Sequence, residues 1–130
     1  MKIIHSMVRV RDLPRSLAFY EAALQLSVAA RFDFEGFTLA YLRNEETSFE
    51  LELTHNHNQD CDYELGNGYG HLALSVANLD AEHQRLQTGG FEPTPIKDFF
   101  RDDALMARFF FLQDPDDYKI EILQRHGRYC

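Results

Sequence analysis

The chain has 130 residues, of which 45% are hydrophobic, and it carries a formal net charge of −8. This apolar content suits one packed domain and argues against disorder, while the negative charge opposes binding to nucleic acid or anionic lipid. No run of 18 apolar residues and no secretory leader is recognisable. The two cysteines form neither a CxxC motif nor the framework of paired spacings typical of a disulfide-rich protein. We therefore expect a cytoplasmic protein with a small-molecule partner and no membrane contact.

The first half of the chain predicts a strand, a helix and further strands. Residues 2–11 alternate between apolar and polar side chains, so a strand would place His5 and Arg9 on one face. Asp12 is suited to cap a helix that ends near Leu26. The strands that follow are predicted at residues 32–42 and 48–54. One more short strand would complete a βαβββ module.

The second half of the chain repeats this order of elements. Its predicted elements are a strand at 71–76, a helix from Asn78 to about Gln87, a charged loop at 97–103, and strands at 107–112 and 118–123. Pro93 and Pro95 keep the segment after the helix from being a central strand. The predicted fold class is therefore α+β, with two βαβββ modules.

Two short segments of the first half recur in the second half. Residues 5–13 align without a gap on residues 71–79, an offset of 66 from 5 to 71. Residues 49–53 align in the same way on residues 118–122, an offset of 69 from 49 to 118. Repeats of this kind indicate a duplicated structural unit. The modules are predicted at approximately 1–60 and 68–125, within a single domain that spans 1–130.

The duplication pairs His5 with His71 and Glu52 with Glu121. Each of these side chains lies on the polar face of its predicted strand, opposite an apolar face. Two imidazoles and two carboxylates would leave positions open on a six-coordinate divalent ion, and open positions are what metal catalysis requires. The sequence therefore predicts a metal site made of these four residues.

Other polar residues share the faces of the predicted ligands. Arg9 lies on the His5 face, where it would bind a substrate carboxylate or form a surface ion pair. Asn56 lies on the Glu52 face and has the same two alternatives, substrate contact or surface position. His55 and His57 point away from Glu52, which favours a surface pair over a chelating pair.

Longer stretches surround the four predicted ligands and their neighbours. They are His5 with Met7-Val8-Arg9-Val10, Leu51-Glu52-Leu53-Thr54-His55-Asn56, Gly68-Tyr69-Gly70-His71-Leu72-Ala73-Leu74-Ser75-Val76, Asp114-Pro115-Asp116 and Tyr118-Lys119-Ile120-Glu121. In these stretches the chain resembles glyoxalase I, a family of lactoylglutathione lyases in the vicinal oxygen chelate superfamily. The resemblance implies paired βαβββ modules in a homodimer, with two metal sites at the subunit interface. His5 and Glu52 would come from one chain and His71 and Glu121 from the other. Nickel or cobalt is implied ahead of zinc.

The resemblance also implies a reaction. It is the isomerisation of the hemithioacetal of methylglyoxal and glutathione to S-lactoylglutathione, through an enediolate. By the same resemblance Glu121 would serve as the base and Glu52 as its possible partner in returning the proton. Arg9 and Asn56 match positions that hold the glutathione peptide in the family.

The chain departs from the family pattern in two places. Asp117 stands where the family has glycine, which Asp tolerates at positive φ at some cost. In the segment 99–110, relatives carry a loop with lysine and glycine over the glycine carboxylate of glutathione, whereas this chain has Asp102 and Asp103. The candidates to substitute for that lysine are Lys97, Arg101 and Arg108.

Several alternatives share the fold but differ in function. Within the fold, the chain would be a metal-dependent enzyme acting on another thiol adduct or substrate, or a non-catalytic small-molecule binding protein. A methylmalonyl-CoA epimerase would have Gln at the second ligand position, where this chain has Glu52. Fosfomycin-modifying transferases use three protein ligands, and extradiol dioxygenases use two His and one Glu. Neither set accommodates an additional Glu52 well.

Overall fold

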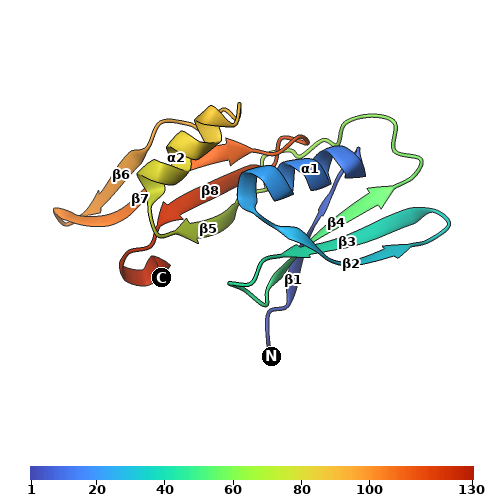
Figure 1. Cartoon of the computed structure of the whole chain (residues 1–130), viewed down its shortest axis with the longest axis horizontal. Coiled ribbons are helices and arrows are strands. Elements are labelled where there is room, and N and C mark those ends of the chain that lie inside the picture. The colour runs from blue at the N-terminus through green and yellow to red at the C-terminus, as the bar shows by residue number, and fades with distance from the viewer. The chain divides into compact units, whose positions relative to one another are not determined.

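The computed structural model describes all of residues 1–130. The chain divides into two compact units, residues 1–64 and 65–130, each with a four-stranded sheet and one α-helix (Figure 1). The first unit contains β1 (His5–Arg9), α1 (Leu13–Leu24), β2 (Ser27–Asp33), β3 (Phe37–Arg43) and β4 (Glu50–Asn56). The second unit contains β5 (Leu72–Val76), α2 (Leu79–Thr88), β6 (Lys97–Arg101), β7 (Ala104–Gln113), β8 (Lys119–Gln124) and the short 3₁₀ turn η1 (Gly127–Tyr129).

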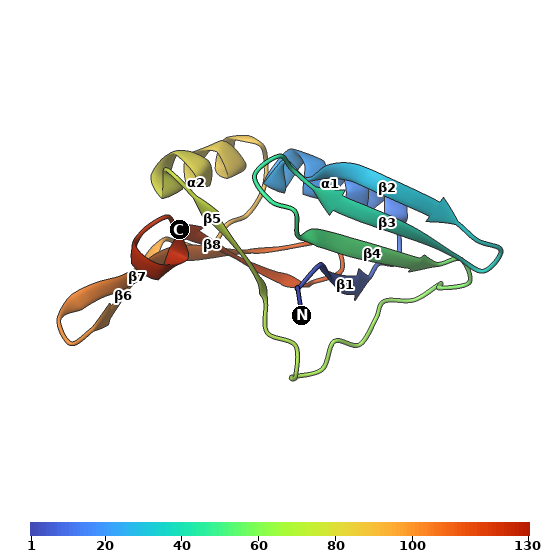
Figure 2. The same ribbon diagram turned by 90° about the horizontal axis from the view of Figure 1, so that it is seen from below.

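The two sheets have the same topology. Their strand orders are β1-β4-β3-β2 and β5-β8-β7-β6. In each sheet the first strand of the unit pairs in parallel with the last strand, and the remaining pairs are antiparallel (Figure 2). Each unit is thus a βαβββ module, and the predicted α+β class is confirmed.

Alternation along the strands separates a buried face from a polar face in each unit. In the first unit the buried face carries Val8 and Leu53, which are 6% and 0% exposed. In the second unit Phe110 and Ile122 occupy the equivalent face and are 0% and 1% exposed. Each such side chain contributes about 1.5–3 kcal/mol relative to an exposed position. This burial orients the strands, so the intervening polar residues must face the other way.

Polar side chains begin both α-helices, as the sequence predicts. The carboxylate of Asp12 accepts a hydrogen bond from the backbone N–H of Arg15 at 3.0 Å, and the amide oxygen of Asn78 accepts one from Ala81 at 3.0 Å. Helix α1 ends at Leu24, followed by Gln25 in a left-handed conformation. Neither α-helix has the length and apolar composition needed to span a bilayer.

The predicted single strand at 32–42 is wrong, because the chain turns within it. Residues 27–33 and 37–43 form separate antiparallel strands, and the backbone N–H of Phe34 donates to the carbonyl of Phe37 at 2.9 Å across the turn. Aromatic residues fill both sides of this turn and conceal it in the hydrophobic pattern. The hairpin supplies the additional strand that completes the first βαβββ module.

The predicted charged loop at 97–103 is also wrong. Residues 97–101 form the edge strand β6, whose side chains are all exposed and therefore lack the apolar pattern of a strand. Asp102 and Asp103 have φ values of 50° and 62° and make the two-residue turn into β7. Positive φ at both central residues is the geometry that favours Asp, Asn and Gly in tight hairpins.

Asp117 has a φ of 69°, which agrees with the resemblance, since the resemblance implies a position usually held by glycine. We expect Asp117→Gly to raise the free energy of unfolding by about 0.5 kcal/mol, because glycine adopts this conformation without steric cost. Asp117→Val should lower it by about 1 kcal/mol or more, since a β-branched residue is poorly accommodated there. Urea denaturation measures both. An equal loss in the two variants would mean that the Asp117 side chain, rather than its backbone, matters.

Candidate metal centre

His5 and Glu52 lie together on the polar face of the first sheet. The parallel pairing of β1 with β4 sets Met7 opposite Glu52. His5 precedes Met7 by two residues and therefore lies on the same face of the sheet as Glu52. His5 Nε2 lies 3.1 Å from Glu52 Oε2. The imidazole is 37% exposed, whereas the carboxylate is only 11% exposed. A partly accessible imidazole is thus held against a nearly buried carboxylate.

His71 and Glu121 form the same arrangement in the second unit. The parallel pairing of β5 with β8 sets Ala73 opposite Glu121, and His71 directly precedes β5. His71 Nε2 lies 3.1 Å from Glu121 Oε2, with side-chain exposures of 41% and 16%. The structure therefore brings together, within each unit, the His and the Glu that the sequence repeat singled out.

An aromatic ring supports each histidine, and sequence reasoning missed both rings. Tyr41 on β3 meets His5 edge-on at 5.8 Å, and Phe111 on β7 meets His71 edge-on at 5.4 Å. Tyr41 is opposite Glu52 in the sheet, and Phe111 is opposite Glu121. The ungapped repeat hid this match, because Glu52 follows Tyr41 by 11 positions whereas Glu121 follows Phe111 by only 10.

The two carboxylates differ in how firmly they are held. Thr54 Oγ1 donates a hydrogen bond to Glu52 Oε1 at 3.2 Å. Burial, followed by the charge of Glu52 and a hydrogen bond to it, raises the pKa of Tyr41, so its hydroxyl stays protonated and able to donate. At the position equivalent to Thr54 the second unit has Leu123, which offers Glu121 no hydrogen bond. Glu52 is consequently the more restrained carboxylate.

The donor set of the two half-sites suits a divalent metal ion. Each half-site offers one imidazole nitrogen and one carboxylate oxygen, and such mixed donors suit nickel, cobalt and zinc. Neither unit alone gathers three or more His, Cys, Asp or Glu side chains into a cluster. Two donors are too few for a stable protein site of this kind. The residues fit a metal only if two half-sites combine.

Arg9 and Asn56 lie on the same face as His5 and Glu52, which we call the ligand face of the first sheet. Arg9 is opposite Thr54 and makes no ion pair within its unit, so the alternative of a surface ion pair is not seen there. The side-chain amide of Asn56 donates to the hydroxyl of Tyr63 at 3.3 Å. Both residues extend the ligand face beyond Glu52.

His55 and His57 lie on the opposite side of β4 from Glu52. Their ring centroids are 5.6 Å apart. Each imidazole makes a polar contact with a residue outside the half-site. His55 Nδ1 lies 3.3 Å from the carbonyl oxygen of Val10, and His57 Nε2 lies 2.9 Å from Thr38 Oγ1. Neither imidazole joins the half-site.

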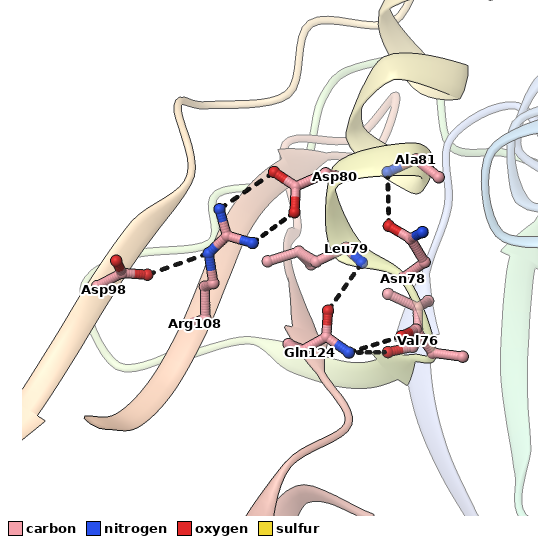
Figure 3. A network of polar contacts seen from close by, with 9 residues as sticks. Val76, Asn78, Leu79, Asp80, Ala81, Asp98, Arg108 and Gln124 are labelled. Atoms are coloured by element: carbon pink, nitrogen blue, oxygen red, sulfur yellow. Dashed lines mark hydrogen bonds and ion pairs between the residues drawn. The ribbon is translucent and has the colours of Figure 1, made fainter. Parts of the chain in front are cut away.

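The three basic residues predicted to take the place of the family's lysine occupy different surroundings. In the second sheet we call the face that carries Glu121 the ligand face, and Phe111 lies on it opposite Glu121. Lys97 is opposite Phe109, whose ring meets that of Phe111 on this face. Arg108 points to the other face and binds acidic side chains there (Figure 3). Arg101 Nε lies 3.6 Å from a carboxylate oxygen of the adjacent Asp102 at the exposed hairpin tip. Of the three, Lys97 alone lies on the ligand face.

The fold and its paired half-sites define a duplicated βαβββ protein that carries one His–Glu pair per unit. The sequence model of the Glyoxalase/Bleomycin resistance protein/Dioxygenase superfamily matches residues 2–122. The chain belongs to this superfamily.

Relatives within the superfamily share one enzyme name. A probable lactoylglutathione lyase of Synechocystis is 37% identical, and the alignment covers 98% of each chain. A lactoylglutathione lyase of Neisseria meningitidis is 38% identical over 96% of this chain and 91% of its own. The resemblance to the glyoxalase I family is therefore confirmed over nearly the full length.

Solved structures of glyoxalase I have the same fold. Glyoxalase I of Zea mays is 30% identical with a TM-score of 0.79, and the match covers 97% of this chain and 45% of that one. The trypanothione-dependent glyoxalase I of Leishmania major is 30% identical with a TM-score of 0.75, covering 95% and 86% of the two chains.

We expect Glu52→Gln to lower the pKa of Tyr41 toward its ordinary value, because the substitution removes the negative charge that disfavours the phenolate. The measurement is the ultraviolet absorbance of phenolate against pH in chelated protein, with the Tyr41→Phe variant as the blank that isolates Tyr41. Glu50→Gln on the same strand should have a smaller effect, since the charge of Glu50 is the weakest of the causes that raise this pKa. An unchanged titration in Glu52→Gln would contradict the contact.

Proposed function

We propose that this protein is a metal-dependent lactoylglutathione lyase, which isomerises the methylglyoxal–glutathione hemithioacetal to S-lactoylglutathione. The observation that carries the proposal is the pair of matched half-sites, each with a histidine nitrogen 3.1 Å from a glutamate oxygen. Relatives of that name, 37% and 38% identical over almost the whole chain, support the same reaction. We place the enzyme in the cytoplasm, because cysteines without paired spacing suit a reducing compartment.

His5, Glu52, His71 and Glu121 would hold one divalent ion. We propose that the first half-site of one chain combines with the second half-site of a partner chain in a homodimer, so that each dimer has two metal sites. Nickel or cobalt is favoured, with zinc as the further candidate. The bound ion would polarise the substrate carbonyl and stabilise the negative charge that develops on the substrate oxygens.

Glu121 is the proposed base. Its carboxylate takes the proton from the hemithioacetal carbon, which leaves an enediolate, and returning a proton to the neighbouring carbon completes the isomerisation with the carbon–sulfur bond intact. The base must be mobile enough to reach both carbons. The looser surroundings of Glu121 support this role, because Thr54 and Tyr41 restrain Glu52.

The basic side chains on the ligand faces support an anionic substrate. Arg9 lies on the first ligand face, and Lys97 and Lys119 lie on the second. None of the three makes an ion pair within its unit, although the chain carries 21 acidic residues. Glutathione presents two carboxylates, which unpaired cations would bind. The amide of Asn56 is suited to contact the peptide between them.

A thiol other than glutathione is a competing candidate for the substrate. Asp102 and Asp103 form the hairpin turn in the segment where the family carries a lysine loop. The Leishmania relative is trypanothione-dependent, so a different thiol is compatible with the fold. Another thiol adduct is therefore the second candidate substrate. A non-catalytic binding protein is less well supported, since it would not need two matched half-sites.

We expect chelated protein to lose hemithioacetal isomerisation and to regain it with nickel or cobalt more than with zinc. In the reconstituted enzyme, Glu121→Gln should lower kcat by about 10²-fold or more, because it removes the base. The measurement is the decrease in hemithioacetal absorbance with each metal in turn.

The matched control for Glu121→Gln is Glu50→Gln, which alters a carboxylate that pairs with Arg43 at 3.6 Å rather than with a histidine. This variant should retain activity within about twofold. Full turnover by Glu121→Gln would refute the proposed base, and turnover only with another thiol would favour the second candidate.

A mixing experiment tests whether two chains share each site. One variant carries His5→Gln and Glu52→Gln, and the other carries His71→Gln and Glu121→Gln. Each should be inactive alone. After co-refolding in equal amounts they should recover about a quarter of the parental activity, since half of the dimers are mixed and each mixed dimer has one intact site.

Sites built within single chains would give a different outcome. Every chain in the mixture would then lack one half-site, and no activity would return. Size-exclusion chromatography of both variants serves as the control, because a variant that fails to dimerise cannot complement the other.

A further inference from the structure

Strand β6 forms the outer edge of the second sheet and buries none of its side chains. Its pairing with β7 is irregular, because the register shifts between Phe99 and Phe100. A strand without a buried face lacks the apolar pattern that decides which side chains point to which face. The orientation of β6 therefore depends on other interactions.

Arg108 of β7 provides such an interaction on the helix-covered face (Figure 3). Its Nε lies 3.2 Å from Asp98 Oδ1 on β6, and its Nη2 donates to Asp80 Oδ1 on α2 at 3.1 Å. The third guanidinium nitrogen, Nη1, donates to the other carboxylate oxygen of Asp80. One planar cation thus binds two carboxylates and ties three elements together. We call this set of three residues the Asp80–Arg108–Asp98 bridge.

The bridge has a consequence for Lys97, which directly precedes Asp98. Successive side chains of a strand point to opposite faces. Because Arg108 holds Asp98 on the helix-covered face, Lys97 is directed to the ligand face. There it is opposite Phe109. Phe109 lies two residues from Phe111, which is the residue opposite Glu121. Lys97 makes no ion pair within its unit, which leaves its ammonium available to an anion.

We propose that the Asp80–Arg108–Asp98 bridge is a positioning device that holds Lys97 on the ligand face, where the ammonium binds a carboxylate of the thiol substrate. This inference rests on the proposed function and assigns a role to Arg108 that its sequence position does not suggest. Arg108 itself does not contact substrate, because both of its acidic partners lie on the opposite face of the sheet.

The test uses the full-length, metal-loaded enzyme and its Asp98→Asn variant. This substitution removes the negative charge of Asp98 but keeps the shape of the side chain. We expect Lys97→Met to raise KM for the hemithioacetal about tenfold with little change in kcat, as for the loss of one charge-assisted hydrogen bond. Asp98→Asn should raise KM in the same direction, and it should add little further in the Lys97→Met background.

A second measurement separates positioning from general destabilisation. Hydrogen exchange followed by mass spectrometry should show faster exchange in residues 97–101 of Asp98→Asn and of Arg108→Met. The control is Glu82→Gln, which removes the ion pair between Glu82 and Arg85 within α2 and touches no residue of β6. It should change neither the exchange of β6 nor KM.

Three outcomes would overturn the inference. These are unchanged exchange of β6 in Asp98→Asn, a loss confined to kcat, and an equal rise in KM from Asp98→Asn with and without Lys97. Failure of the proposed function looks different, because the parent enzyme itself would then show no turnover of the hemithioacetal and no binding of S-methylglutathione by calorimetry.

Discussion

The parallel pairing of the first and last strands in each unit is the constraint on which the candidate site depends. His5 and Glu52 are far apart in the chain, as are His71 and Glu121, and the pairs β1–β4 and β5–β8 bring each His–Glu pair to 3.1 Å. Parallel strands require a crossover connection, which the intervening helix and strands supply. The βαβββ order of each unit thus sets one histidine beside one glutamate.

The buried face of each sheet determines which side chains lie on the ligand face. Residues such as Leu53 and Ile122 are almost fully buried, so their strand neighbours Glu52 and Glu121 are directed to the opposite face. The same constraint does not reach the sheet edge, where β6 buries nothing. There an ion-pair bridge centred on Arg108 takes the place of apolar burial. Core packing positions the His–Glu pairs, and surface charge orients the edge strand.

The two units repeat one architecture but differ in the side chains around their carboxylates. The first unit restrains Glu52 through Thr54 and Tyr41, whereas the second offers Glu121 a phenylalanine and a leucine at the corresponding positions. Glu52 therefore has hydrogen-bond partners on its own sheet that Glu121 lacks. Such a difference suits a reaction in which one group must shuttle a proton between adjacent carbons.

The amino-acid sequence by itself determined the class of fold, both helices and the four candidate ligands, because burial alternates regularly along the central strands and the repeat aligns His with His and Glu with Glu. It did not reveal the β2–β3 hairpin, whose turn is hidden among aromatic residues, or β6, which has no buried face. Tyr41 and Phe111 also escaped, since loops of different length shift them out of the ungapped repeat. Only the tertiary structure decided the pairing of His with Glu within each unit and the face that each basic residue occupies. Strand register sets the pairing, through backbone hydrogen bonds between segments distant in the chain, and at the sheet edge the ion pairs of Arg108 orient β6.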